Sequence, residues 1–137
     1  MNIYSLHTEE KSNTAELYQP QAVWYCSIQF IAAMNYNQAW FAMEQNEWQH
    51  IIWLMAHNIK SSDYKSIQKS IRAKVKAIIY LGSERREVHQ SLATCTVVIA
   101  RASSGEEALK MAEQLYQVGD VIIVSPTHSV QHFINQF

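Results

Sequence analysis

The amino-acid sequence predicts an α/β domain with a Rossmann-like, doubly wound, mostly parallel sheet of five or six strands and helices on both faces. Four short segments, residues 51–55, 77–81, 96–100 and 121–124, are almost wholly apolar. Such continuous hydrophobicity is typical of strands that are buried on both faces. Segments with helical periodicity separate these strands, and this alternation indicates parallel strands joined by crossover helices.

The N-terminal half predicts the first elements in order. Residues 1–20 show no strong periodicity and are expected to form a tail, a hairpin or an edge strand, whereas the domain is expected to span residues 21–137. The aromatic and β-branched content of residues 23–30 predicts a first strand. Apolar residues recur at spacings of three or four in the segments expected to be helical, which are residues 37–47, 64–74 and 84–92.

The clearest helix signal is S-S-G-E-E at residues 103–107. Serine at an N-cap with glutamate three residues later forms a capping box. Apolar residues then keep a helical period as far as Tyr116, and Gly119 is expected to cap the C-terminus. The strand at 121–124 and a short helix from about Val130 complete the pattern.

Composition and charge exclude several classes of protein. The 137 residues are 48% hydrophobic, which fits one folded domain, and a net charge of −1 predicts no nucleic-acid or membrane partner. Cys26 and Cys95 lie in apolar runs and are expected to be buried free thiols. The N-terminal residues lack the pattern expected of a signal peptide, and the longest apolar-leaning run, residues 23–34, is too short to span a bilayer. We therefore expect a cytoplasmic protein.

Ligands in this architecture bind beyond the carboxyl ends of the strands. His57, Lys60, Arg101 and His128 follow predicted strands and could converge on an anion. The favoured interpretation is that these loops are polar because they face water. His128 and His132, together with His57, lack a cysteine or carboxylate co-ligand, so no metal site is expected. Phosphate-binding glycine motifs are absent from the sequence, and no cofactor is expected.

Four segments, in order, resemble the C-terminal domain of the Mur ligases, most closely the D-glutamate-adding branch of peptidoglycan synthesis (MurD). Residues 35–44, N-Y-N-Q-A-W-F-A-M-E, resemble N-V-N-S-T-W-Y-A-L-E of that family. Residues 51–64 are similar to a strand followed by G-G-x-D-K-G-N-D-Y, residues 75–82 to V-K-A-I-x-x-L-G, and residues 119–126 to G-D-V-V-L-L-S-P. The resemblance covers about residues 22–137 and implies the same fold.

The resemblance also implies an amino-acid site of which only part is retained. In the family this domain holds the incoming amino acid and closes over ATP on a central domain, while an N-terminal domain holds the UDP-sugar. Both other domains are expected to be missing here. The family's D-S-K-A-T-N falls on F-I-A-A-M-N at residues 30–35, where Asn35 is the one polar residue that matches. In the loop, Ile59 replaces an aspartate and the glycines are absent, whereas Lys60 matches the lysine that reaches the substrate carboxylate. Ser129 stands in for the substrate-binding serine.

We therefore expect a stand-alone, degenerate Mur-ligase-like domain that is not a ligase by itself and acts as a binding or interaction module. A homodimer or a protein partner is expected to use exposed aromatic residues, for which the candidates are Trp24, Trp40, Phe41 and Trp48. The alternative is the amino-acid-binding half of an ATP-dependent peptide ligase, completed in trans by a separate ATPase domain and binding a small carboxylate. A third hypothesis is a small-anion sensor. No catalytic residue is expected, and the expected ligand-binding residues are Lys60, Asn35, Ser125, Ser129, His57 and Arg101.

Overall fold

The computed structural model describes residues 22–25, 27–56, 61–81 and 98–137. The elements in these ranges are β1 Ala22–Tyr25, β2 Ile28–Ala32, α1 Tyr36–Gln45, β3 Ile51–Met55, α2 Ser61–Lys74, β4 Val75–Leu81, β5 Val98–Ala102, α4 Gly105–Leu115, β6 Val121–Ser125 and α5 Val130–Gln136. The helix predicted at 84–92 lies outside the described residues, as do Cys26 and Cys95. None of the described helices has the length and apolar character that a bilayer crossing requires.

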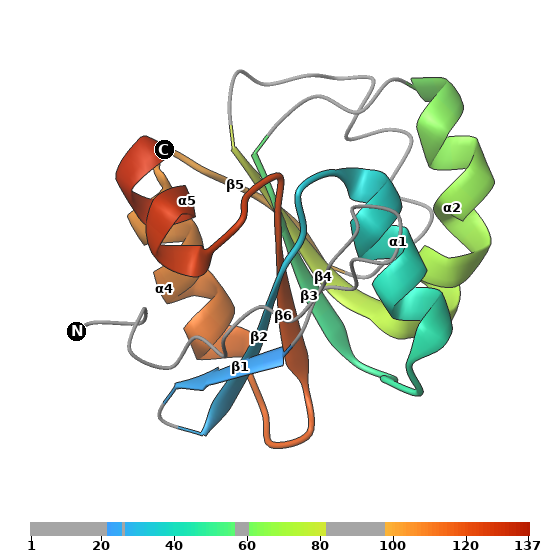
Figure 1. The fold of residues 1–137 in the computed structure, drawn as a ribbon, viewed down its shortest axis with the longest axis horizontal. Coiled ribbons are helices and arrows are strands. Elements are labelled where there is room, and N and C mark those ends of the chain that lie inside the picture. Colours follow the sequence, from blue (N-terminus) through green and yellow to red (C-terminus); the bar gives the residue numbers. More distant parts are fainter. Residues whose placement is uncertain (1–21, 26, 57–60, 82–97) are drawn as a thin grey trace, which may run out of the picture.

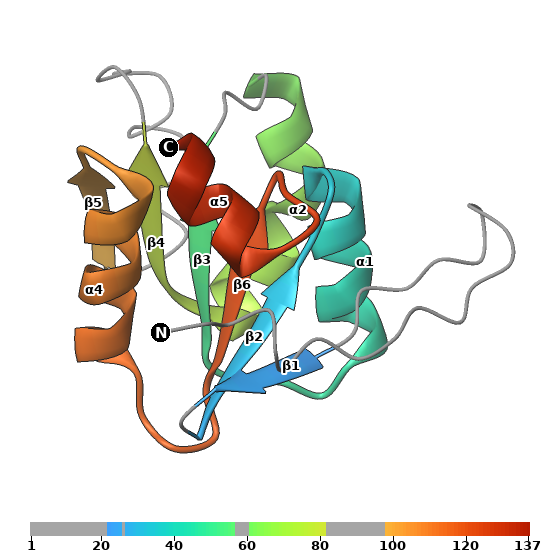
Figure 2. The same cartoon turned by 60° about the vertical axis from the view of Figure 1, so that its left-hand side comes forward.

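The described strands form one sheet in the order β1-β2-β6-β3-β4-β5 (Figures 1 and 2). β1 is antiparallel to β2, and the other neighbouring pairs are parallel. Helices α1 and α2 cover one face of the sheet, and α4 and α5 cover the other (Figure 1). This arrangement confirms the predicted α/β class with a mostly parallel sheet. β6, the last strand in the chain, lies between β2 and β3.

The prediction of one strand over residues 23–30 is wrong, because the chain reverses within that segment. β1 and β2 form a hairpin in which Tyr25 pairs with Ile28. Ser27 adopts a φ of 68° in the turn, and two-residue hairpin turns need such positive φ values. The backbone N–H of Gln29 also donates to the Tyr116 hydroxyl at 3.2 Å. The hairpin therefore adds an antiparallel edge strand that apolar patterning alone does not predict.

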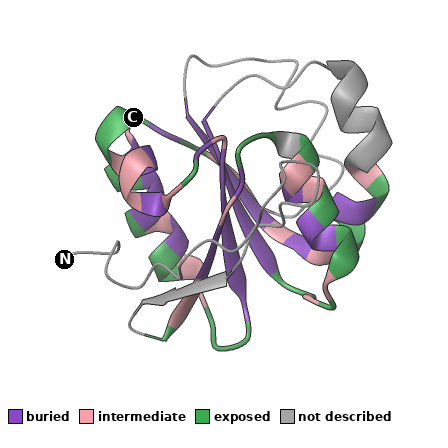
Figure 3. Cartoon of the chain, viewed as in Figure 1, coloured by how far each residue is buried: buried purple, intermediate pink, exposed green. Residues whose placement is uncertain are grey.

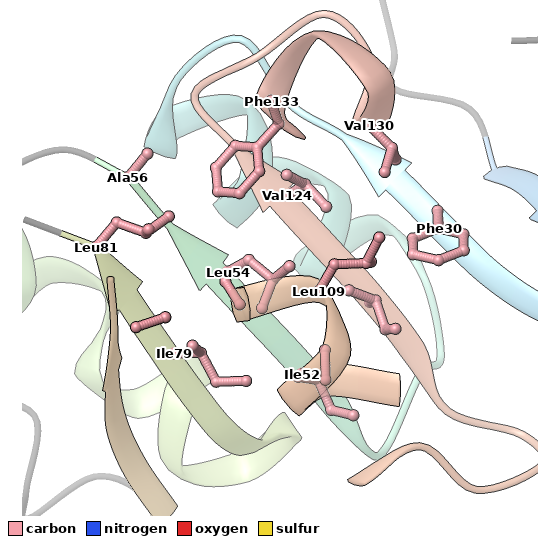
Figure 4. Packing of buried hydrophobic residues seen from close by; sticks show 14 of the residues in the cluster. Phe30, Ile52, Leu54, Ala56, Ile79, Leu81, Leu109, Val124, Val130 and Phe133 are labelled. Carbon is pink, nitrogen blue, oxygen red and sulfur yellow. The ribbon is translucent and has the colours of Figure 1, made fainter. Parts of the chain in front are cut away.

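The core lies on both faces of the sheet, which explains the continuous apolar runs (Figure 3). In β3 every residue is buried. Trp53 belongs to the cluster under α1 and α2, whereas its neighbours Ile52 and Leu54 belong to the cluster under α4 and α5. Figure 4 shows this second cluster, in which Phe133 of α5 and Leu109 of α4 lie over the strands. Successive side chains of a strand point to opposite faces, so a central strand between two helix layers must be apolar throughout.

The capping box predicted for α4 is confirmed. The Glu107 N–H donates to the Ser104 hydroxyl at 3.1 Å, and the Glu107 carboxylate accepts from the backbone N–H and the hydroxyl of Ser103. The prediction that Gly119 caps the C-terminus is wrong, because the helix ends earlier, at a Tyr116 C-cap with a ψ of 134°. Gly119, with a φ of 98°, instead belongs to the turn that leads into β6.

A glycine allows α4 and α5 to approach closely. A Cβ atom on Gly105 would lie 2.8 Å from the backbone oxygen of Phe133. Real Cβ atoms essentially never come so near another heavy atom. The start of α4 can therefore pack against the backbone of α5 only because residue 105 has no side chain.

Polar side chains connect α1 to α2. The Glu44 carboxylate accepts a hydrogen bond from the Ser70 hydroxyl at 2.5 Å and one from Trp40 Nε1 at 3.0 Å. The Ser70 bond, followed by the Trp40 bond and the charge of Lys74, lowers the pKa of Glu44 below its usual value, while partial desolvation opposes this shift. Lys74 Nζ also donates to the backbone oxygen of Asn46 at 3.0 Å. These contacts fix the C-terminal end of α1 against α2.

An ion pair connects the start of β4 to the turn before β6. Lys76 Nζ contacts the carboxylate of Asp120, whose side chain is 3% exposed. Lys76 also donates to the backbone oxygen of Leu115 at 2.9 Å, and the Gln117 N–H donates to Asp120 Oδ2 at 2.9 Å. The buried carboxylate thus has both a counter-ion and a hydrogen-bond donor, as a buried charge requires.

Candidate functional site

The carboxyl ends of β2, β6 and β3 lie together where the connections diverge to opposite faces of the sheet. β2 and β3 lead to α1 and α2, whereas β6 leads to α5 (Figure 2). In open α/β sheets such a switch point is where ligands bind. Backbone hydrogen bonds join the strand ends: Ala33 N donates to Val124 O at 2.9 Å, Thr127 N to Ala33 O at 2.8 Å, and Ala56 N to Ser125 O at 2.9 Å. The edge on which the candidate residues lie is therefore held by main-chain contacts.

Asn35 lies at the end of β2 and caps α1. Its side-chain oxygen accepts from the backbone N–H of Gln38 at 2.9 Å, and Gln38 Oε1 accepts from the N–H of Met34 at 2.8 Å. Asparagine is among the preferred N-cap residues because it satisfies a free N–H of the first turn. The Asn35 carbonyl also accepts from Ala39 N at 3.2 Å. This side chain therefore has a structural partner at the candidate site.

Ser125 is the last residue of β6, and its side chain is buried. Its hydroxyl accepts a hydrogen bond from Nε1 of Trp53 on β3 at 2.8 Å. A buried indole N–H needs an acceptor, so the fold itself uses this hydroxyl. Ser125 and Trp53 are 72 residues apart in sequence. No sequence motif connects them, although a tryptophan within an apolar strand indicates that its N–H needs a polar partner.

Ser129 caps α5 in the loop that follows β6. Its hydroxyl accepts from the backbone N–H of His132 at 3.0 Å. Thr127, which is buried, donates from Oγ1 to the carbonyl of Ser129 at 2.8 Å and accepts from its N–H at 3.3 Å. Sequence reasoning missed Thr127, whose polar atoms order the loop. The peptide bond between Ser125 and Pro126 in the same loop is cis.

The four residues of the anion hypothesis are not brought together by the described part of the structure. Arg101 is exposed within β5, opposite Tyr80 of β4. His128 follows β6, and β3 and β4 separate β6 from β5. Three strand spacings place these two strands roughly 14 Å apart. His57 and Lys60 lie outside the described residues.

His128 and His132 are in contact on the same edge of the sheet. Their ring centroids are 4.3 Å apart and the ring planes are inclined by 37°. His128 is exposed and His132 is half-buried. Within the described ranges, no group of three or more histidine, cysteine, aspartate or glutamate side chains is placed to hold a metal ion.

Comparison with curated sequences finds D-glutamate-adding Mur ligases. The chain is 31% identical over 97 residues to the UDP-N-acetylmuramoylalanine–D-glutamate ligase of Salinibacter ruber, and the match covers 71% of this chain and 21% of that protein. It is 30% identical over 94 residues to the corresponding ligase of Porphyromonas gingivalis, covering 69% of this chain and 21% of that protein. The chain thus spans about a fifth of the length of these relatives. No protein-family model matches it.

Comparison with solved structures finds Mur ligases that carry the same fold. The MurF ligase of Thermotoga maritima, solved in complex with ADP, matches with a TM-score of 0.55 and 10% identity, over 85% of this chain and 29% of that one. MurF from Acinetobacter baumannii matches with a TM-score of 0.52 and 12% identity, over the same shares of the two chains. At this identity the likeness concerns the fold alone. The resemblance to Mur ligases expected from the sequence motifs is therefore confirmed by sequence and by fold.

Proposed function

We propose that this chain, a relative of the D-glutamate-adding Mur ligases over a domain that resembles their C-terminal region, is a non-catalytic binding or interaction module. It retains the fold of that region and much of its sequence pattern. The groups with which the family binds a polar amino acid are largely replaced in it. The proposal concerns the residues of β2 and the surface of α1, which are treated in turn.

The observation that carries the proposal is the apolar character of β2. The family's D-S-K segment falls on Phe30, Ile31 and Ala32 in this sequence. Phe30 and Ile31 are each 1% exposed, and they belong to the two core clusters on opposite faces of the sheet. A charged side chain at either position would lose its hydration. These positions therefore stabilise the sheet and offer no ionic contact to an amino acid.

Three polar side chains of the described residues on this edge are engaged within the fold. Asn35 and Ser129 cap helices, and Ser125 accepts from Trp53. A ligand that donated a hydrogen bond to these oxygens would compete with the donors that they already accept from. This supports a role in which the domain is a scaffold.

The surface of α1 supports an interaction role. Phe41 is 43% exposed and Met34, just before the helix, is 49% exposed. Met34 precedes the N-cap Asn35, whereas Phe41 lies within α1. Trp40 and Trp48, by contrast, pack against the core cluster under α1 and α2. Of the aromatic residues expected at an interface whose side chains are described, Phe41 is thus the exposed one. The side chain of Trp24 is not among those that the structure describes.

Light scattering on the purified chain, together with a pull-down from cell extract, tests the interaction role. The proposal predicts a homodimer or a stable complex that is weakened at least tenfold by Phe41→Ser, because the substitution removes exposed apolar area from the contact. Glu113→Ser, an exposed change on α4 at the opposite face of the sheet, serves as the matched control. A chain that remains monomeric and unbound in both measurements would contradict the proposal.

The alternative function is the amino-acid-binding half of a ligase completed in trans. It is favoured by the sequence match to D-glutamate ligases and by the lysine at position 60. It predicts saturable thermal stabilisation by D-glutamate, strongly reduced in Lys60→Ala and unchanged in Lys69→Ala, which alters an exposed lysine of α2. A flat profile across D-glutamate, nucleotides and muropeptides would remove this alternative.

A further inference from the structure

We infer that His128 and His132 form a two-histidine site for a divalent transition metal ion such as Zn²⁺ or Ni²⁺, with water completing the coordination. The inference does not depend on the proposed function. It rests on the contact between the two rings and on the way the loop after β6 fixes both backbones. The sequence predicts no metal site, because the two histidines lack a cysteine or carboxylate co-ligand; in the inferred site water takes the remaining positions.

The separation of the rings is slightly shorter than a shared metal ion requires. A zinc–nitrogen bond of about 2.0–2.1 Å, added to about 1.1 Å from ring nitrogen to ring centroid, places two imidazoles on one metal with their centroids roughly 4.5–5.2 Å apart. The observed centroid distance is 4.3 Å. Rotation of the exposed His128 ring about its side-chain bonds, with a change in separation of less than about 1 Å, suffices to direct both nitrogens at one ion.

The backbone at both histidines is held in place. The N–H of His132 donates to Ser129 Oγ at 3.0 Å. On the other side of His128, the N–H of Thr127 donates to Ala33 O at 2.8 Å. Thr127 Oγ1 further bonds the carbonyl of Ser129 at 2.8 Å. Because the loop is already ordered, little conformational freedom is lost when a metal joins the two rings, which favours binding.

The chemistry of the donors selects the metal. Two neutral imidazoles suit zinc, nickel and copper and disfavour magnesium and calcium, which prefer oxygen ligands. Exposure of His128 leaves one side of the site open to water.

Isothermal titration of the full chain with zinc chloride in a non-chelating buffer tests the inference. We expect one zinc ion per chain, with the affinity reduced at least tenfold in His128→Ala and in His132→Ala and unchanged in His50→Ala, which alters an exposed histidine just before β3. Circular dichroism confirms that each variant is folded. Absence of zinc binding, wild-type affinity in either of the first two variants, or equal weakening in His50→Ala would overturn it.

A spectroscopic measurement on the unaltered chain keeps the inference testable if a variant fails to fold. Paramagnetic Ni²⁺ added in substoichiometric amount should broaden the imidazole proton resonances of His128 and His132 before that of His50. Magnesium chloride at the same concentration should leave all three unchanged. Simultaneous broadening of the three imidazoles by nickel would contradict a defined site.

Discussion

Single residues at the candidate site show how the fold reuses polar groups. Ser125 and Trp53 form a hydrogen bond of 2.8 Å that joins the end of β6 to the middle of the neighbouring strand β3 in the core. The Ser125 hydroxyl matches a position in the family's S-P motif, yet its partner here is a side chain of the same domain. A residue that matches a position of the family's site can therefore have a purely structural partner in this chain.

A double-mutant cycle measures this hydrogen bond. We expect Ser125→Ala to lower the free energy of unfolding by about 1–3 kcal/mol, because the indole N–H loses its acceptor in the core. Trp53→Phe also destabilises, since it loses the donor and part of the ring. The double variant should be less destabilised than the sum of the two, with a coupling of about 0.5–3 kcal/mol in urea denaturation. Strict additivity would show that the bond does not stabilise the chain.

Gly105 provides a second test at this scale. Gly105→Ala should lower the free energy of unfolding by about 1–3 kcal/mol, because the new Cβ atom meets the backbone oxygen of Phe133. Alanine normally stabilises a helix relative to glycine by about 1 kcal/mol, so the sign of the change is diagnostic. Glu113→Ala, an exposed substitution on the same helix, is the matched control and should change stability by less than about 0.5 kcal/mol. A stabilised Gly105→Ala protein would contradict the close contact between α4 and α5.

Among helices and strands, the sequence predicts those with a regular apolar pattern. It does not predict turns and helix ends that depend on a single backbone angle. The central strands β3 and β6 were predicted almost to the residue, because burial on both faces requires continuous apolar runs. The hairpin at Ser27 and the early end of α4 were missed, because each follows from local φ and ψ values that many sequences allow. The sequence predicts that Arg101 follows a strand, but Arg101 lies within β5. The ends of a strand, like those of a helix, also depend on local φ and ψ values. Contacts between residues that are distant in sequence, such as Trp53 and Ser125, produce no local sequence pattern from which they could be predicted.

The contact between α1 and α2 predicts a pH dependence of stability. The Ser70 hydroxyl bond, above all, lowers the pKa of Glu44 in the folded chain, so the folded state binds fewer protons than the unfolded state. This contribution is fully present above about pH 4.3, the usual glutamate value, and is lost as the pH falls through the lower pKa of the folded state. Exposure of the carboxylate keeps the contribution small.

Urea denaturation between pH 3 and pH 7 provides the measurement. The unaltered chain should be more stable than Glu44→Gln at neutral pH, and the difference should shrink as the pH falls below about 4.3. Glu47→Gln, an exposed substitution just beyond α1, serves as the control. A difference that stays constant over the whole range would mean that the ionised form of Glu44 does not stabilise the contact.

The whole molecule combines a Mur-ligase-like fold with an edge whose described polar groups mostly serve that fold. Fold and family resemblance could be predicted from the sequence, because they rest on apolar periodicity and on motifs of several residues. The site could be predicted only in part: sequence indicates which residues follow which strands, but not whether their atoms are already hydrogen-bonded. The ring contact between His128 and His132 is a further property that only the assembled chain reveals.

The most direct test of the central proposal is a ligase assay on this chain. ADP release would be followed with ATP, D-glutamate and UDP-N-acetylmuramoylalanine together, beside an intact D-glutamate ligase as positive control. A non-catalytic module predicts no release above that of buffer, and no change when Lys60→Ala replaces the unaltered chain. Release that saturates with D-glutamate and disappears in Lys60→Ala would contradict it.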